Sequence, residues 1–326
     1  MVFGLCVTAA QAQFSLEADY RGTGNEMLKV FEPQRQVLQT SSALIQEGRT
    51  EAGYGVVISP EGHILVKASE YGRLKDPVVI VDRDKYEGAR LLATDTHWDV
   101  SLIKIEAKGL VPVVYAPTSE VAMGSWVVTN GVSSRIKRRL LMGVVSAKLR
   151  ELAPLGGLAL GVVFEVKDEK LVVKETAEKG GGRKAGVEAG DVLLALGDKS
   201  LKKIEDLSDL LKGFQNGNKV PLKVQRGDKQ LVLEVELMTK DEIFEQRTRN
   251  DEMSGDVSIR RSGFPRVLQH SIIGSSKSVG GPVLDLDSRC VGMNIARANR
   301  AESFAIPVED LKALAQSLMD QAQAPK

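Results

Sequence analysis

Short runs of β-forming residues, each ended by turn residues, lie on both sides of a differently built middle region. Strands this short and this closely spaced are typical of a barrel or a sandwich. A helix interrupted at Pro33 is predicted before them, over Glu26–Gln39. The predicted strands are Ala52–Ser59, His63–Ser69, Pro77–Val81, Ala89–Ala93, Val100–Glu106, Val111–Tyr115, Trp126–Asn130, Leu140–Ala147, Arg266–Ile273, Gly281–Leu286, Arg289–Ile295 and Ser303–Ile306.

The middle region mixes strands with short helices, which predicts a compact α+β module. Its helix is expected at Ile204–Leu211 and a Gly-rich loop at Gly180–Gly182. The chain ends in a helix predicted from about Val308 to Gln321. The strands expected in the module are Leu160–Val166, Lys170–Glu175, Val192–Leu196, Lys219–Gln225 and Gln230–Glu236.

Composition narrows the classes of protein that this chain can belong to. Its 326 residues predict about two domains. The 44 basic and 43 acidic side chains leave a net charge of +1, which provides no overall field for binding nucleic acid. No run of eighteen apolar residues occurs, so no transmembrane span is expected.

The first twelve residues are similar to a clipped signal peptide. Val2–Ala10 is apolar or small, and Ala10-Gln11-Ala12 has the form of a signal-peptidase site, although no basic residue precedes it. We therefore expect residues 1–12 to be a truncated signal peptide of an exported, periplasmic or envelope protein, with a disordered tip as the alternative. Cleavage would leave Cys290 without a disulfide partner, so we expect it to be a buried apolar residue.

No cofactor or metal is predicted. The three histidines lack metal-ligand spacing, and the two cysteines form no C-x-x-C pair. The Gly180–Gly182 run is not followed by the Lys and Ser/Thr of a phosphate loop. Arg135–Arg139 is a basic run that is expected to form a solvated loop, with a site for an anionic partner as the alternative.

Several motifs together resemble the bacterial HtrA (DegP-like) family of trypsin-like serine proteases, which carry PDZ domains. Gly55–Leu65 is similar to the segment before that family's catalytic His, and Asp95–Ile105 to the segment around its catalytic Asp. The remaining motifs are Gln269-His270-Ser271, Val279-Gly280-Gly281-Pro282-Val283, Val291-Gly292-Met293-Asn294-Ile295 and Ser303-Phe304-Ala305-Ile306-Pro307. The resemblance implies a mostly β, two-barrel trypsin-like (chymotrypsin-type) fold.

The middle module resembles a PDZ domain. Leu160-Gly161-Val162 stands where that domain has its carboxylate-binding loop, and Ala185–Leu193 is similar to the pattern A-G-L-x-x-G-D-V-I. The resemblance implies that the PDZ domain is inserted in the second barrel, whose two pieces must meet for the barrel to close. We expect the first barrel and the start of the second at 14–150, the PDZ domain at 151–238, a charged connector at 239–255, and the rest of the second barrel with the terminal helix at 256–326.

The resemblance places Ser69 at the catalytic His position, Asp99 at the Asp position and Val279 at the nucleophile position. A hydroxyl is no base near neutral pH, and an isopropyl group has no lone pair for attack, so a catalytically degenerate member is predicted. Lys277 replaces a glycine that shapes the oxyanion hole of the family. Each of the side chains that could substitute is better explained as a structural or surface residue; these are His63, His97, His270, Ser275, Ser276 and Ser278.

A PDZ domain binds a terminal carboxylate through backbone N–H groups and adds the ligand as a strand to its sheet. Here the resemblance assigns the N–H groups to Leu160, Gly161 and Val162 and the edge strand to Val162–Val166. Leu207 and Leu211 are expected to face the peptide from the helix, with simple core packing as the alternative.

Three function hypotheses follow. The first is an inactive HtrA-like protein that binds polypeptide C-termini or unfolded protein segments as a scaffold, adaptor or holdase. The second is an active serine endopeptidase that uses noncanonical residues. The third is a structural envelope protein with an occluded groove. Assembly as a homo-oligomer is typical of the family and is carried as an expectation.

Overall fold

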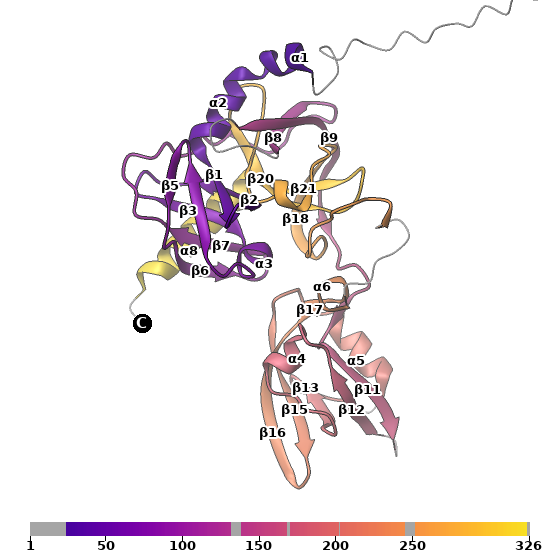
Figure 1. Cartoon of the computed structure of the whole chain (residues 1–326). Helices are drawn as coiled ribbons and strands as arrows, with labels where there is room; N and C mark the ends of the chain where they lie inside the picture. Colours follow the sequence, from indigo (N-terminus) through magenta and orange to yellow (C-terminus); the bar gives the residue numbers. More distant parts are fainter. Residues whose placement is uncertain (1–23, 132–137, 168–169, 202, 245–251, 325–326) are drawn as a thin grey trace, which may run out of the picture.

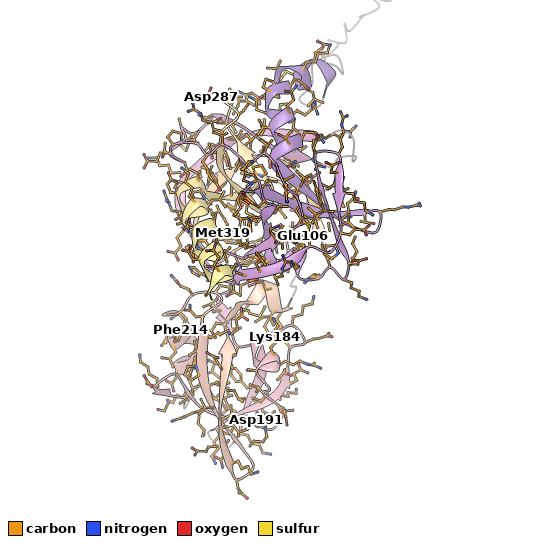
Figure 2. All side chains as sticks on the ribbon, turned by 90° about the vertical axis from the view of Figure 1, so that its left-hand side faces the viewer. Glu106, Lys184, Asp191, Phe214, Asp287 and Met319 are labelled. Carbon is orange, nitrogen blue, oxygen red and sulfur yellow. The ribbon has the colours of Figure 1, made fainter. Side chains whose placement is uncertain are left out.

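The computed structural model describes residues 24–131, 138–167, 170–201, 203–244 and 252–324. Two β-rich units lie together at one end of the molecule, and the α+β module lies at the other (Figure 1). The same division is visible in the view turned by 90°, where Asp191 and Phe214 belong to the module and Met319 to the larger part (Figure 2). The predicted mostly β fold is confirmed. The proposed signal peptide at residues 1–12 lies outside the described residues.

The first unit is an antiparallel sheet with strand order β5-β4-β1-β2-β3-β7-β6. Pro33 lies in the first turn of α2, where its missing N–H is tolerated, and the break predicted near it falls at Phe31. The elements are α1 Asn25–Val30, α2 Glu32–Ser41, β1 Ser42–Glu47, β2 Thr50–Val57, β3 His63–Lys67, α3 Ala68–Tyr71, β4 Pro77–Val81, β5 Asp84–Tyr86, β6 Arg90–Asp95 and β7 Val100–Lys104.

The second unit is a closed barrel in which two strands from before the module, β8 and β9, complete a ring with four strands from after it. Its order is β18-β21-β20-β19-β8-β9, and β9 also pairs with β18 to close the ring. The chain therefore leaves the barrel after β9 and returns at β18. The strands are β8 Trp126–Gly131, β9 Arg139–Leu152, β18 Phe264–His270, β19 Pro282–Leu284, β20 Cys290–Arg297 and β21 Ser303–Pro307, with a 3-10 turn η2 at Ser276–Ser278.

The strand predicted at Val111–Tyr115 is wrong. Tyr115 forms a single bridge to Cys290, and the other hydrogen bonds of this segment are isolated ones that involve Val113 and Val114, so no ladder forms. Val111 and Val114 are exposed, whereas Val113 is buried in the core. Cys290 itself is fully buried in β20, where it packs as an apolar side chain.

One core joins the two β-rich units. It includes Leu38 of α2, Leu65 and Leu102 of the sheet and Met293 of the barrel. The C-terminal helix α8, Val308–Gln323, contributes Leu311, Leu314 and Leu318 to the same core because these residues recur at helical spacing.

The module has its own core and a sheet in the order β11-β12-β13-β15-β16, which leaves β11 at an edge. The helix α5 and the strand β13 have the predicted bounds. The elements are β10 Leu158–Ala159, β11 Val162–Lys167, β12 Lys170–Thr176, α4 Gly181–Lys184, β13 Val192–Leu196, β14 Lys199–Ser200, α5 Ile204–Leu211, β15 Lys219–Arg226, β16 Lys229–Glu236, β17 Met238–Thr239 and α6 Lys240–Phe244.

Two basic or charged segments differ from the prediction. The expected solvated connector begins with β17, which pairs with β10, and with α6, where Thr239, Glu242 and Ile243 are buried. In the expected basic loop, residues 135–137 lie outside the described residues, but Arg138 is fully buried. Its guanidinium packs on the Tyr54 ring, and its Nη2 donates to the Ile80 carbonyl at 2.9 Å. No helix in the described ranges is long and apolar enough to cross a bilayer.

Candidate functional site

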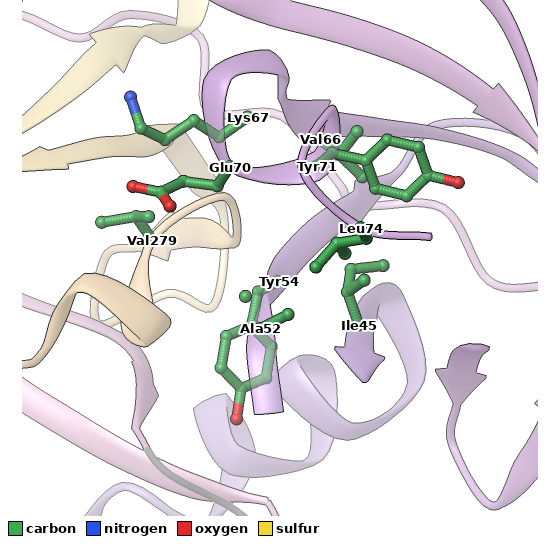
Figure 3. Close-up of a pocket in the computed structure, with 10 residues that line it drawn as sticks. Ile45, Ala52, Tyr54, Val66, Lys67, Glu70, Tyr71, Leu74 and Val279 are labelled. Carbon is green, nitrogen blue, oxygen red and sulfur yellow. The ribbon is translucent and has the colours of Figure 1, made fainter. Parts of the chain in front are cut away.

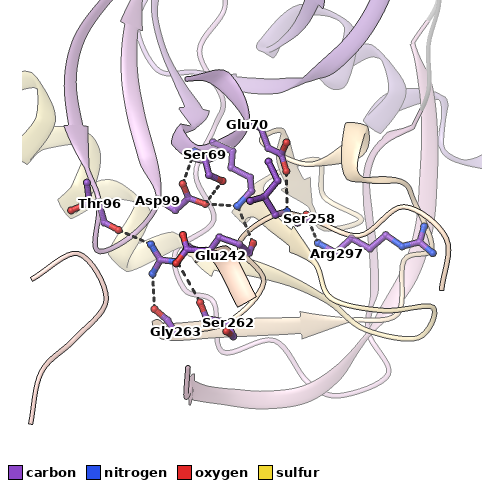
Figure 4. Close-up of polar contacts among 12 residues, drawn as sticks. Ser69, Glu70, Thr96, Asp99, Glu242, Ser258, Ser262, Gly263 and Arg297 are labelled. Carbon is purple, nitrogen blue, oxygen red and sulfur yellow. Dashed lines mark hydrogen bonds and ion pairs between the residues drawn. The ribbon is translucent and has the colours of Figure 1, made fainter. Parts of the chain in front are cut away.

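Asp99 and Ser69, which lie far apart in the sequence, meet at one buried point (Figure 4). The Ser69 backbone N–H donates to Asp99 Oδ1 at 2.7 Å, and Ser69 Oγ donates to Asp99 Oδ2 at 2.9 Å. Asp99 has a positive φ of 58° just before β7, a conformation that Asp tolerates better than most side chains. The carboxylate is thus held by Ser69, the residue that was predicted at the His position.

A second partner of Asp99 is Lys67, which the sequence interpretation missed. Lys67 Nζ forms an ion pair with Asp99 Oδ2, and the two side chains are only 2% and 4% exposed. Lys67 Nζ also donates to the Arg260 carbonyl at 3.1 Å. The signal in the sequence was the lysine at the end of the apolar strand His63–Lys67, where a buried ammonium requires a carboxylate nearby.

Arg260 is buried beside this pair and joins two segments through carbonyl oxygens. Its Nη1 donates to the Thr96 carbonyl at 2.5 Å, and its Nη2 donates to the His97 and Gly263 carbonyls at 2.7 and 2.6 Å. The guanidinium lies 4.5 Å from the centroid of the Phe264 ring. Burial raises the pKa of Glu242, although the positive charge of Arg260 opposes this.

Val279 is 1% exposed and lines a small pocket together with residues of the first β-rich unit (Figure 3). Its carbonyl accepts a hydrogen bond from the Tyr54 N–H at 2.9 Å. The space, which Lys67 and Glu70 also line, has a volume of about 10 Å³, enough for roughly one water molecule.

The loop before Val279 uses its own polar groups internally. Ser275 Oγ accepts a hydrogen bond from the Lys277 N–H at 3.2 Å, so this N–H has an acceptor already. Ser278 is buried, and its Oγ accepts from the Ser275 N–H at 3.2 Å. These bonds fold the loop into η2 and leave the hydroxyl of Ser278 facing the chain itself.

The three histidines lie apart from this loop. His63 Nδ1 is 2.7 Å from Ser59 Oγ, but this pair belongs to the turn between β2 and β3, and burial lowers the pKa of His63. His97 Nδ1 lies 3.2 Å from the Asn216 carbonyl oxygen. Burial lowers the pKa of His270 to about 4, against an opposing contribution from Asn294. Among the described residues, no hydrogen bond joins any of these rings to Ser278.

The second candidate site is a groove of about 770 Å³ between β11 and α5. It is lined by Leu160, Val162, Leu207 and Leu211, four of the five residues predicted to bind peptide. Because β11 is an edge strand, its backbone can accept an added strand on the groove side.

The fifth predicted residue, Gly161, shapes the loop at the end of the groove. It has a positive φ of 73°, and a Cβ on it would lie 2.4 Å from the Gly180 Cα. The Gly-rich run that was examined as a phosphate loop is therefore required for backbone packing. In the described part of the chain, the N–H groups of Leu160 and Gly161 have no acceptor, so both remain for a ligand.

The groove extends beyond the module to residues that the sequence interpretation did not include. Pro154 and Gly156 line it from the segment after β9, and Lys240 and Phe244 line it from α6. Both connections between barrel and module therefore contribute to the site. Within the described ranges, no group of three or more His, Cys, Asp and Glu residues is arranged to hold a metal ion.

Comparisons with known proteins agree with these features. Residues 159–237 match the PDZ domain family. A probable periplasmic serine endoprotease, DegP-like, of Ectopseudomonas mendocina is 24% identical over 270 residues, which cover 58% of this chain and 57% of the relative. A protein of the same description from Pseudomonas fulva is 34% identical over 101 residues, covering 31% of this chain and 21% of the relative.

Among solved structures, the serine endoprotease from Yersinia pestis aligns with a TM-score of 0.34 at 15% identity, covering 65% of this chain and 98% of that chain. The chain spans between half and three fifths of the length of the first curated relatives, 57% and 55%. The fold and the groove define a mostly β, trypsin-like protein with a PDZ domain. Residues 159–237 thus belong to the PDZ domain family, and the chain is similar to DegP-like serine endoproteases.

Proposed function

We propose that this chain is a catalytically inactive HtrA-type protein that binds polypeptide C-termini or unfolded protein segments through its PDZ groove, as a scaffold, adaptor or holdase. The observation that carries the proposal is the open groove beside the β11 edge, with two N–H groups that have no acceptor among the described residues. The pocket beside Val279 is far smaller than this groove, with a volume of about 10 Å³ against about 770 Å³.

Inactivity follows from the chemistry of the three triad positions. Acyl transfer needs a nucleophile, a base to remove its proton and donors for the oxyanion. The Ser69 hydroxyl donates a hydrogen bond to Asp99 and cannot act as the base, and the Val279 side chain has no lone pair for nucleophilic attack. The Lys277 N–H already donates to Ser275 Oγ, so it is not free to bind an oxyanion. Removal of a single triad member costs about 10⁴–10⁶ in rate, so the absence of two supports a complete loss.

Peptide binding follows from the edge strand. A ligand that runs antiparallel to β11 gains main-chain hydrogen bonds, while its terminal carboxylate accepts from the N–H groups at Leu160 and Gly161. Leu207 and Leu211 then contact apolar ligand side chains from α5. Such a site selects extended, apolar polypeptide and does not require a specific folded partner.

The location of the protein is part of the same proposal. Relatives are described as probable periplasmic serine endoproteases, which supports export of this chain to the periplasm or cell envelope. The net charge of only +1 provides no strong positive potential, which supports polypeptide and not nucleic acid as the partner. Homo-oligomer formation and the domain limits given above remain predictions.

The test is a C-terminal peptide array probed with the full chain. We expect binders with apolar C-termini, and a loss of at least tenfold in affinity for Leu211→Lys. The matched control is Val232→Lys, because Val232 is 62% exposed on β16, away from the groove. An array without any binder would remove the peptide-binding role and favour the structural envelope protein.

A different measurement distinguishes the inactive protein from the alternative, an active endopeptidase that uses noncanonical residues. The chain is incubated with unfolded casein and with a fluorophosphonate probe. We expect no turnover and no labelled serine, because Ser278 is buried within its own loop. Labelling of Ser278 would support the active enzyme and refute the inactive one.

A further inference from the structure

We propose that Lys67 has replaced the imidazole as the partner of Asp99, so that the former catalytic carboxylate is now the anchor of a buried junction between segments. This inference rests on the proposed loss of catalysis, since it assigns a different role to the same carboxylate. The groove and its ligands do not enter the argument.

The first step is the burial of the pair. Lys67 and Asp99 are 2% and 4% exposed, and an ammonium taken out of water to this extent needs both a counter-ion and further acceptors. Lys67 Nζ has the Asp99 carboxylate and the Arg260 carbonyl, and its charge also lies 5.8 Å from the Phe264 ring centroid. Each buried charge is therefore compensated by the opposite charge of its partner.

The second step is that the pair joins segments from different parts of the chain. Lys67 ends β3, Asp99 precedes β7, and Arg260 belongs to the segment that returns from the module to the barrel. The Arg260 guanidinium extends the junction to the Thr96 and His97 carbonyls. His97 in turn contacts the Asn216 carbonyl of the PDZ domain at 3.2 Å.

The third step concerns what Asp99 can still do. Its Oδ1 accepts from the Ser69 N–H, and its Oδ2 accepts from both Lys67 Nζ and Ser69 Oγ. An imidazole introduced at position 69 would meet a carboxylate whose charge is already balanced by an ammonium in contact. Such a carboxylate neither favours the imidazolium nor orients the ring as a protease requires.

Other charged groups around the junction are Glu70 on α3, Glu242 on α6 and the Arg260 guanidinium. Burial raises the pKa of both Glu70 and Glu242, and the positive charges of Lys67 and Arg260 respectively oppose this. Among these groups, Lys67 is the one that forms an ion pair with Asp99.

The experiment compares two variants of the full chain by NMR titration of the introduced imidazole. With Ser69→His alone, we expect it to titrate below the ordinary histidine value. With Lys67→Met and Ser69→His together, Asp99 is free to pair with the imidazolium, and we expect a midpoint higher by at least about one pH unit. The native His63, His97 and His270 signals identify the new resonance by difference.

A midpoint above the ordinary value in the single variant would overturn the proposal, because it would show Asp99 paired with the imidazole despite Lys67. The single variant decides the question even if the double variant does not fold. Peptide binding of the wild-type chain is measured in parallel. If the wild-type chain binds no peptide, the proposed function is refuted, but the proposed role of Lys67 is not affected.

Discussion

The backbone of Gly161 packs directly against the backbone of Gly180: a Cβ on Gly161 would lie 2.4 Å from the Gly180 Cα. The loop that ends the peptide groove is therefore held by a contact in which neither residue has space for a side chain. The geometry of the free N–H groups depends on this contact.

We predict that Gly161→Ala abolishes peptide binding. The new methyl group must displace the Gly180 backbone, and the positive φ adds strain of roughly 1 kcal/mol. The control is Gly227→Ala, which has a φ of 57° but nothing within 4 Å of its Cβ. Fluorescence anisotropy with an array-selected peptide measures the effect. Equal affinities of the two variants would contradict the packing argument.

Loss of the buried ammonium should destabilise the fold strongly. We expect Lys67→Met to lower the free energy of unfolding by about 3–5 kcal/mol, because Asp99 is left buried without a counter-ion. Lys212→Met breaks the exposed pair with Asp209 and should cost at most about 0.5 kcal/mol. Urea unfolding measures both. A cost for Lys67→Met no larger than that for the exposed pair would refute the role of burial.

Stability should depend on pH through His270. Its pKa is lowered to about 4 in the folded chain, whereas an unfolded histidine titrates near 6.5. The unfolded state therefore binds the proton first, so stability is full above the unfolded value and falls as the pH decreases toward 4. The loss is at most about 3 kcal/mol.

This dependence is measured by urea unfolding between pH 7 and pH 4. In His270→Leu, the part of the slope due to this residue should disappear. His63→Gln is the comparison, since His63 is only partly buried and should change the slope less. An unchanged slope in His270→Leu would show that the ring is already protonated or hydrated in the folded state.

The connectors should contribute to ligand affinity. Phe244, 38% exposed, lines the groove from α6, outside the matched PDZ residues 159–237. We expect Phe244→Ala to weaken peptide binding by about threefold to tenfold through lost apolar contact. Leu155→Ala is the matched control, because Leu155 is exposed in the other connector but does not line the groove. Similar losses in both would indicate a general effect on the connectors.

Local patterns in the sequence were sufficient for much of the secondary structure. Pro77–Val81, Val192–Leu196 and Ile204–Leu211 form elements with the predicted bounds, because β-branched runs and helical spacing act over a few residues. Val111–Tyr115 has the same β-branched character but forms only a single bridge, to Cys290, because it lacks the repeated hydrogen bonds to a neighbouring strand that a ladder requires. The strand β1 was missed although it lies at the centre of the first sheet.

The sequence alone determined the residue types at the triad positions and the glycine-containing loop of the groove, since both are properties of short motifs. Only the tertiary structure decided that Lys67 pairs with Asp99 and also donates to the Arg260 carbonyl, 193 positions further along the sequence. It also brought both connectors to the groove. Contacts of this kind depend on how a barrel closes across an inserted domain, and this closure is not encoded in any local pattern.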